Sequence, residues 1–385
     1  MKKYVISVGA GKNQLPLIKR LVERGYGVIS FDKDVTAPGK QFSDVFNDIS
    51  TWDYDNAILW LDSLGLSFKG VVCFSCGYAL VTQMYLLEHY RLNGKIKKEY
   101  LHINTNKQLL RFYLNKFKLT KLMELSFEEY IHSDIENEKT KYIIKKKDGI
   151  SSKNIQIANN IMPSKPIIPT SNNDYIIQEY IDGIEYRIIS LVKDKKAKFI
   201  SVMERDNLKN TFFTGRLNPT DNYDKKIIFL IEKVIEKFEL IDSALKIDVI
   251  QNENRIEILE IDFGIGGDYF ETIISPSCYN YNFIDNYINL MLGLPVQEKR
   301  TLNNGLCFDY IYNIDKKENL IVDYSKIFDI ANNYFFEYNI VKIKEQRQLV
   351  RYPKSNMDAV FGIIHDRKDL SNYDVNILFN KALSK

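Results

Sequence analysis

The N-terminal segment alternates apolar runs, glycines and a helical pattern, and this order constrains the fold more than any other feature of the chain. Residues 4–9 (YVISVG) form an apolar, β-rich run that ends at Gly9 and Gly11. LPLIKRLVERG then has helical spacing, and VISFDKD forms a second apolar run. Two strands joined through a helix usually lie parallel in one sheet, so the pattern predicts the start of a doubly wound α/β domain.

The remaining pattern predicts three regions. GVVCFSCG at 70–77 supplies another strand before a helical segment, so we expect the first domain to span 1–105. Helices alternate irregularly with strands after residue 106, which indicates an α+β domain at 106–300 with a lid at about 125–177. A mixed α/β segment at 301–385 should be rich in short strands, with one helix near 323–333.

Charge and apolar content exclude several classes of protein. The 53 Lys and Arg nearly balance the 50 Asp and Glu, and Lys145 to Lys147 form only a short basic run. We therefore expect no nucleic-acid partner, because such binding needs a concentrated basic face. No window approaches the roughly 20 apolar residues of a membrane-spanning helix, so no membrane role is expected. Four cysteines and an N-terminus without a signal-peptide core favour a cytoplasmic location.

The glycines after the first strand allow two interpretations. Gly9-Ala10-Gly11 could bring the backbone close to a dinucleotide pyrophosphate, but Gln14 stands where the third glycine of that fingerprint would be. The same residues suit a tight strand-to-helix turn. We do not predict NAD binding from two glycines.

A hairpin expected at 244–262 carries acidic residues inside apolar runs. Glu260 and Asp262 are two residues apart and share a face, and an odd-length loop would place Asp248 on that face too. Three converging carboxylates repel one another unless a cation such as Mg²⁺ neutralises them. A solvated polar face of the hairpin is the alternative. The glycine turn at 264–268 would let the backbone approach a phosphate.

The order and spacing of these elements resembles the ATP-grasp superfamily, in particular its carboxylate-amine ligases, which include amino-acid ligases and biotin carboxylase-like and carbamoyl phosphate synthase-like enzymes. VISVGAGKNQLPLIKRLVERGYGVISFDKD resembles the α/β domain that precedes the nucleotide site in that family. TNK, YIIKKKDGISSKNI and IIQEYIDGIEYRI resemble three segments that contact ATP. The resemblance implies an ATP-grasp fold with an N-terminal parallel α/β domain and a small C-terminal β-rich segment.

The resemblance also implies a set of site residues. Its lysines would bind phosphate oxygens, its hinge residues would meet adenine, Glu185 would accept the ribose hydroxyls, and the covering loop would donate to phosphates. The implied ATP-binding residues are Lys107, Lys145, Ser151, Ser152, Lys153, Gln178, Glu179, Ile181 and Glu185. The implied ligands of Mg²⁺ or Mn²⁺ are Asp248, Glu260 and Asp262.

Gly264 is the most serious of several departures from the family pattern. The others are Ser151 and Asn154 in place of covering-loop glycines, and Asp262 in place of the usual Asn. Gly264 stands where the family usually has an arginine that steadies the acyl phosphate or the tetrahedral intermediate, and such stabilisation can be a large catalytic effect. Arg205 and Arg216, in neighbouring segments of the same domain, are the candidates for supplying this charge.

The resemblance implies an ATP-dependent ligase that activates a carboxylate as an acyl phosphate, joins it to an amine, and releases ADP and phosphate. The expected partners are ATP and small-molecule carboxylate and amine substrates, and a homodimer is left open. Two alternatives remain: a bicarbonate- or formate-activating enzyme of the same fold, and a nucleotide-binding scaffold without catalysis. The sequence does not identify the acid or the amine.

Overall fold

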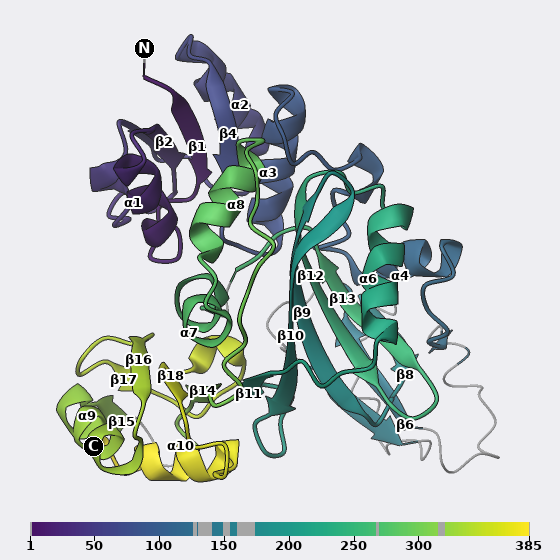
Figure 1. Ribbon diagram of the computed structural model, residues 1–385, viewed down its shortest axis with the longest axis vertical. Coiled ribbons are helices and arrows are strands. Elements are labelled where there is room, and N and C mark those ends of the chain that lie inside the picture. The colour runs from purple at the N-terminus through teal and green to yellow at the C-terminus, as the bar shows by residue number, and fades with distance from the viewer. Residues whose placement is uncertain are drawn as a thin grey trace.

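The computed structural model describes residues 2–125, 129, 141–148, 155–159, 174–266, 269–314 and 320–384. These residues form an N-terminal α/β region, a central region built on the largest sheet, and a C-terminal region at one end of that sheet (Figure 1). Within this part of the chain, no helix is long and apolar enough to cross a membrane.

The N-terminal region contains the predicted parallel sheet. Gly25, with a φ of 79°, ends the first helix and lets the chain turn into the next strand. The sheet has the order β3-β2-β1-β4, with β1 (Tyr4–Val8), β2 (Gly27–Phe31), β3 (Val45–Asn47) and β4 (Phe68–Val72). Its helices are α1 (Leu15–Glu23), α2 (Tyr54–Ser63) and α3 (Tyr78–His89). The predicted α/β class of this region is confirmed.

The central region is built on an eight-stranded antiparallel sheet that continues into the C-terminal region. Its strands in spatial order are β13 (Ile256–Asp262), β12 (Ser243–Gln251), β9 (Ile184–Lys193), β10 (Lys196–Asn207), β11 (Thr214–Pro219), β14 (Cys307–Ile311), β18 (Phe361–His365) and β16 (Tyr338–Lys342). The predicted hairpin is confirmed as β12 and β13, which we call the acidic hairpin.

Two helices cover one face of the β9, β12 and β13 part of this sheet: α4 (Lys107–Lys116) and α6 (Lys226–Lys237) (Figure 1). Phe238 at the end of α6 packs against Phe117 after α4 and against Phe263 after β13, with ring centroids 5.2 and 5.4 Å apart. Such aromatic pairs stabilise beyond their buried area, by roughly 0.5–1.5 kcal/mol each. The start of α4 and the end of the acidic hairpin are therefore held in one packed layer.

A small antiparallel sheet lies beside the central one. Its strands in spatial order are β5 (Glu124–Leu125), β8 (Tyr175–Glu179), β6 (Lys141–Lys146) and β7 (Gln156–Asn159). Most described residues of the lid predicted at about 125–177 belong to this sheet, and the remaining part of that segment lies outside the described residues. The two strand-like runs around Gly183 prove to be β8 and β9, which belong to different sheets.

Helix α8 (Phe283–Met291) connects the central region to the N-terminal region. Asp285 accepts two hydrogen bonds from Arg20 on α1, each 2.7 Å long. The hydroxyl of Tyr287 donates to the carbonyl oxygen of Cys73 at 3.0 Å and accepts from the amide of Cys73 at 3.2 Å. The chain after β4 is thus tied to a helix from the second half of the sequence.

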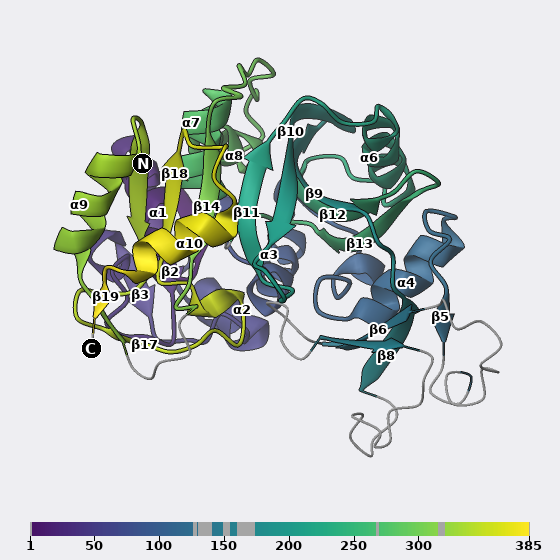
Figure 2. The same ribbon diagram turned by 90° about the horizontal axis from the view of Figure 1, so that it is seen from below.

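The C-terminal region adds strands to the central sheet and a second, three-stranded sheet. The smaller sheet has the order β17 (Leu349–Val350), β15 (Leu320–Val322) and β19 (Leu383–Ser384). The helix predicted near 323–333 is α9 (Tyr324–Tyr334), whereas α10 (Asn372–Asn380) was missed. Helix α10 lies across β11 and β14 (Figure 2). Among the described residues, the other helical segments with defined bounds are α7 (Ser275–Tyr279) and the short turns at Lys40–Phe42, Lys98–Tyr100, Phe270–Ile274 and Asn356–Asp358.

A buried ion pair joins the central and C-terminal strands. Arg216 on β11 donates to both oxygens of Asp309 on β14 at 2.7 Å, and His365 on β18 lies 2.9 Å from the same carboxylate. Burial alone would raise the pKa of Asp309, but its hydrogen bonds to Arg216 and His365 lower it. This carboxylate therefore stays ionised where three strands meet.

Removing that carboxylate should destabilise the protein strongly. We expect Asp309→Ala to lower the free energy of unfolding by about 3–5 kcal/mol, because it leaves the Arg216 charge buried and unpaired. The control is Asp221→Ala, whose surface pair with Arg300 should contribute less than about 1 kcal/mol. Urea denaturation followed by circular dichroism measures both, and equal losses would contradict the argument.

Candidate functional site

A cavity of about 570 Å³ lies between the central sheet, the small sheet and the end of the N-terminal region. The C-terminal region closes one side with Tyr310, Tyr312 and Asn356, and Cys76 and Gly77 line it from the N-terminal region. The sequence-predicted residues that line it are Lys107, Lys145, Gln178, Glu179, Ile181, Glu185, Arg205, Asp248, Glu260 and Asp262. Ser151, Ser152 and Lys153 lie outside the described residues.

Lys107 and Lys145, which we call the lysine pair, form one wall. Asn106 caps α4 by accepting a hydrogen bond from the amide of Leu109 at 3.0 Å, as expected for a helix that begins with Asn. The amide of Lys107 donates to the carbonyl of Lys147 at 2.9 Å, which ties the start of α4 to the end of β6. Two segments far apart in sequence thereby present adjacent ammonium groups.

Burial disfavours the charged ammonium form of both lysines, and nearby positive charges add to this effect at Lys145. Burial lowers the pKa of Lys107. Burial also lowers the pKa of Lys145 to about 7, with further lowering by Arg111 and Lys107, while Glu260 and Glu124 oppose the shift. A polyanion bound here would reverse both effects, because opposite charge nearby favours the ammonium form.

Arg111 was missed by the sequence interpretation. Its guanidinium is buried on α4 and donates from Nη2 to the carbonyl oxygens of Ile258 at 2.6 Å and Leu259 at 3.1 Å. These carbonyls directly precede Glu260, so Arg111 fixes the strand that carries this carboxylate relative to the helix that carries Lys107. A basic residue one helical turn after Lys107 was the only signal in the sequence.

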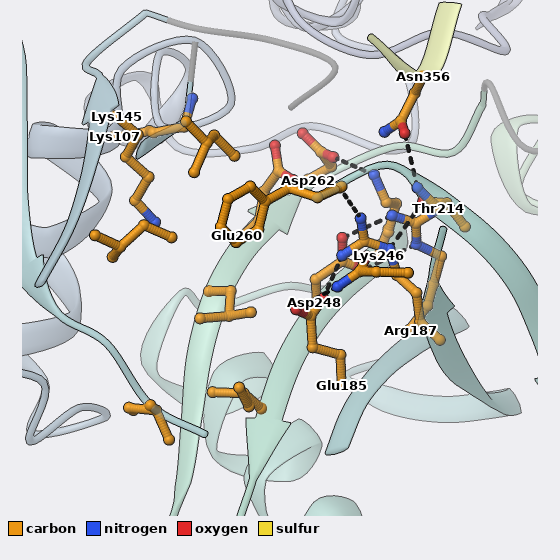
Figure 3. A pocket seen from close by; sticks show the side chains of 18 of the residues that line it. Lys107, Lys145, Glu185, Arg187, Thr214, Lys246, Asp248, Glu260, Asp262 and Asn356 are labelled. Atoms are coloured by element: carbon orange, nitrogen blue, oxygen red, sulfur yellow. Dashed lines mark hydrogen bonds and ion pairs between the residues drawn. The ribbon is translucent and has the colours of Figure 1, made fainter. Parts of the chain in front are cut away.

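The acidic hairpin forms the opposite wall. Asp248 pairs with Glu260 in the strand register, and Lys246 pairs with Asp262, so these four side chains share the face that lines the cavity. The three carboxylates therefore lie on one face, as predicted. Figure 3 shows Glu260 and Asp262 between the lysine pair and Lys246.

Two buried cations pair with these acids, and neither was anticipated. Arg187 on β9 donates to both oxygens of Asp248 at 2.8 Å, and Lys246 Nζ lies 3.1 Å from Asp262 Oδ2. Burial would raise the pKa of Asp248, but the charges of Arg187 and Lys246 outweigh it and hold the pKa below its usual range. Burial raises the pKa of Asp262, with Lys246 opposing and Glu260 adding to the rise.

The expected convergence of Asp248, Glu260 and Asp262 around a cation stays a prediction. Among the described residues, no group of three or more His, Cys, Asp or Glu is arranged to hold a metal ion. Arg187 donates to both oxygens of Asp248. Asp262 Oδ1 is buried without a hydrogen-bond partner among the described residues, and Glu260 lines the cavity beside it. These two carboxylates fit a Mg²⁺ ion that takes its other ligands from phosphates and water.

The two candidate arginines occupy different places. Arg205 lines the cavity, where its guanidinium bonds to Glu185, to Thr214 Oγ1 at 2.8 Å and to the carbonyl of Phe212 at 3.0 Å. Arg216 does not line the cavity, and its guanidinium is hydrogen-bonded to Asp309. The expectation that Arg216 supplies charge at the reacting centre therefore finds no support, and Arg205 braces Glu185.

Gln178 and Glu179 are the last two residues of β8, an inner strand of the small sheet. Gln178 is fully buried, and its Nε2 donates to Glu124 at 3.2 Å, while its Oε1 has no partner among the described residues. Glu179 accepts from the amide of Met123 at 3.1 Å and from Arg255 at 2.8 Å. The carboxylate of Glu179 is thus used within the protein, whereas Gln178 retains an unpaired acceptor beside the cavity.

The place of the missing arginine is filled. A Cβ atom at Gly264 would lie only 2.3 Å from Cδ2 of Leu80, which belongs to the first turn of α3. Phe74 and Ile265 form a parallel bridge beside this contact. A side chain at position 264 would therefore require the Leu80 side chain to move.

Residues 113–267 match the sequence profile of the ATP-grasp domain, so the chain contains an ATP-grasp domain. This confirms the resemblance seen in the sequence. A comparison with curated proteins found no match.

Three solved structures show the same fold over nearly the whole chain. Phosphoribosylglycinamide synthetase from Anaerococcus prevotii is 18% identical with a TM-score of 0.71, and 99% of this chain covers 98% of it. N5-carboxyaminoimidazole synthetase from Staphylococcus aureus, complexed with ADP, is 13% identical with a TM-score of 0.74 and the same coverage. L-amino acid ligase from Bacillus licheniformis is 14% identical with a TM-score of 0.74, and 100% of this chain covers 98% of it.

The low pKa of Lys145 leads to a testable linkage. With a pKa of about 7, Lys145 is roughly nine-tenths neutral at pH 8, where phosphate groups are fully ionised. Binding of ATP should raise this pKa, so the protein should take up close to one proton per ATP at pH 8 and bind ATP more weakly as the pH rises above 7. Calorimetry in buffers of different ionisation enthalpy measures this uptake.

Lys145→Arg should abolish most of that uptake, because a guanidinium stays charged throughout this range. Lys141→Arg, at an exposed position of the same strand, is the control and should retain it. Unchanged uptake in Lys145→Arg would assign the proton to another group.

Proposed function

We propose that the protein is an ATP-dependent ligase that forms a carbon-nitrogen bond between a carboxylate and an amine. The observation that carries the proposal is the meeting, in one cavity of an ATP-grasp domain, of the lysine pair with Glu260 and Asp262. Cations on one wall and oxygen ligands on the other suit a nucleotide triphosphate bound with Mg²⁺. The three similar structures are named as synthetases or a ligase, which supports the same class.

The proposed nucleotide site uses residues from both sheets. The lysine pair binds phosphate oxygens as compact charges. The unpaired Oε1 of Gln178 is suited to accept a hydrogen bond from the amino group of adenine, with the backbone of Glu179 and Ile181 beside it. Glu185 accepts the ribose hydroxyls and is held for that role by Arg205. Ser151, Ser152 and Lys153 remain proposed donors to the phosphates.

The proposed metal ligands are Glu260 and Asp262, with Asp248 acting mainly as the partner of Arg187. A bound Mg²⁺ or Mn²⁺ would neutralise phosphate charge and so make the terminal phosphorus more open to attack. Lys246 lies against Asp262 at the same edge and provides a positive charge where the family arginine is missing. A buried cation needs no reorganisation as negative charge develops, which is the condition for effective electrostatic stabilisation.

The proposed reaction proceeds by attack of the acid on the terminal phosphate of ATP, followed by attack of the amine on the acyl phosphate, with release of ADP and phosphate. The protein contributes mainly position and charge. Its fixed cations orient the reacting oxygens, and the walls of the cavity limit access of water to the activated acid.

The alternatives differ in what triggers ADP release. An ADP-release screen should use amino acids and sugar acids with small amines, and bicarbonate and formate as separate acids. Release that depends on both an acid and an amine supports the ligase, whereas release with bicarbonate or formate supports the other acid classes. A protein that binds ATP without releasing ADP under any condition would instead be a nucleotide-binding scaffold.

The metal assignment is tested by Glu260→Gln. This change removes a charge while keeping the volume, so turnover should fall by a factor of about 100 or more, the loss expected when a major electrostatic contributor is removed. The melting temperature should stay close to that of the unmodified protein, because Glu260 makes no ion pair among the described residues. Glu253→Gln in the hairpin turn is the matched control, and full activity of Glu260→Gln would remove Glu260 from the metal site.

Nucleotide binding should also stabilise the small sheet. We expect ATP with Mg²⁺ to raise the melting temperature and to slow amide exchange in β6 and β8, because the lysine pair and Gln178 join that sheet to the ligand. Hydrogen exchange with mass spectrometry measures this effect, and α9 serves as an internal reference that should not change. Equal exchange in β6 and β8 with and without nucleotide would argue that the segment does not close over ATP.

A further inference from the structure

The start of helix α3 opens on the cavity without a side-chain cap. Gly77 is its N-cap residue, with a φ of 68°, and it lines the cavity together with Cys76. The first amides of a helix lack partners within it, and the helix dipole places partial positive charge at this end. An anion is therefore favoured beside Gly77, provided that a second group defines where it binds.

Asn104 supplies that second group. Its side chain is only 9% exposed and lines the same cavity. Oδ1 accepts a hydrogen bond from the amide of Phe263 at 3.4 Å, which identifies Nδ2 as the donor end. Nδ2 is buried without a partner among the described residues. A buried donor left unpaired costs about 1–3 kcal/mol, so an acceptor from a ligand is the natural partner.

These donors are held in fixed register with the acidic hairpin. Phe263 directly follows Asp262, so Asn104 is bonded to the residue next to a proposed metal ligand. Leu80 packs on Gly264. A Cβ atom added at Gly266 would lie only 2.5 Å from the amide nitrogen of Ser75, so the two segments are in close contact. The start of α3 therefore cannot move independently of the strand that carries Glu260 and Asp262.

We infer that Asn104 Nδ2 and the start of α3 bind the carboxylate group of the acid substrate. This inference rests on the proposed ligase activity. Neutral donors suit a carboxylate that must attack phosphorus, because they orient the anion without the full charge of an ion pair. The phosphates would be bound separately, by the lysine pair on the other side of the cavity.

The decisive variant is Asn104→Asp. It keeps the shape of the side chain and the Oδ1 acceptor for the amide of Phe263. It replaces only the Nδ2 donor, with a carboxylate oxygen whose negative charge would repel the carboxylate of the substrate. The assay is acyl-phosphate formation in a panel of carboxylic acids, trapped with hydroxylamine as the hydroxamate, together with ATP binding by calorimetry. We expect KM for the reactive acid to rise about 10- to 100-fold, as for loss of a buried hydrogen bond to a charged group, while the Kd of ATP changes less than about twofold.

Matched variants exclude indirect effects. Asn115→Asp adds the same charge at an exposed position of α4 and should leave both constants unchanged. Asn104→Ala removes the donor without adding charge, and its KM for the acid should rise by a smaller factor than in Asn104→Asp. Melting temperatures report whether either variant has lost its fold.

Two results would overturn the inference. A fall in ATP affinity that matches the rise in KM would assign Asn104 to the phosphates and overturn the inference, as would an unchanged KM in both Asn104 variants. If the unmodified protein forms no hydroxamate with any acid, the ligase activity itself fails and the inference falls with it. That failure is recognised in the unmodified protein before any variant is compared.

Discussion

The cavity depends on the pairing of buried carboxylates with buried cations across adjacent strands. Arg187 on β9 holds Asp248 on β12, and Lys246 on β12 holds Asp262 on β13. Ionised carboxylates this close would otherwise repel one another or take up protons. The pairs keep the acids ionised and fix the order of three strands at the same time. Glu260 is left as the acid without such a partner among the described residues, beside the unpaired Oδ1 of Asp262.

The opposite wall of the cavity carries an excess of basic side chains. Lys107, Lys145 and Arg111 gather around α4 and β6. Burial lowers the pKa of each, and the charges of Arg111 and Lys107 lower that of Lys145 further. The charged forms of these basic side chains are therefore disfavoured while no anion is bound beside them. Binding of a polyphosphate at the proposed site would relieve this repulsion at Lys145.

The N-terminal region is a structural part of the site because α3 packs directly on the acidic hairpin. The Leu80 side chain packs against Gly264 and would have to move to admit a larger residue there, and Gly77 at the start of α3 lines the cavity. Helix α8 reinforces the arrangement through Asp285 and Tyr287, which bond to α1 and to the chain after β4.

Local patterns in the sequence were sufficient for the parallel N-terminal sheet, the acidic hairpin and the helix that begins at Lys107, because alternation, helical spacing and capping residues act over a few neighbours. They also indicated that Asp248, Glu260 and Asp262 share a face. Helix α10 was missed although Ser371 and Asp374 form a capping box at its start, since its apolar spacing is irregular. Only the tertiary structure decided which cation meets which carboxylate. Arg187, Lys246 and Arg111 reach the acids or their strand through strand pairing and helix packing, and such long-range contacts leave no periodic signal in the chain.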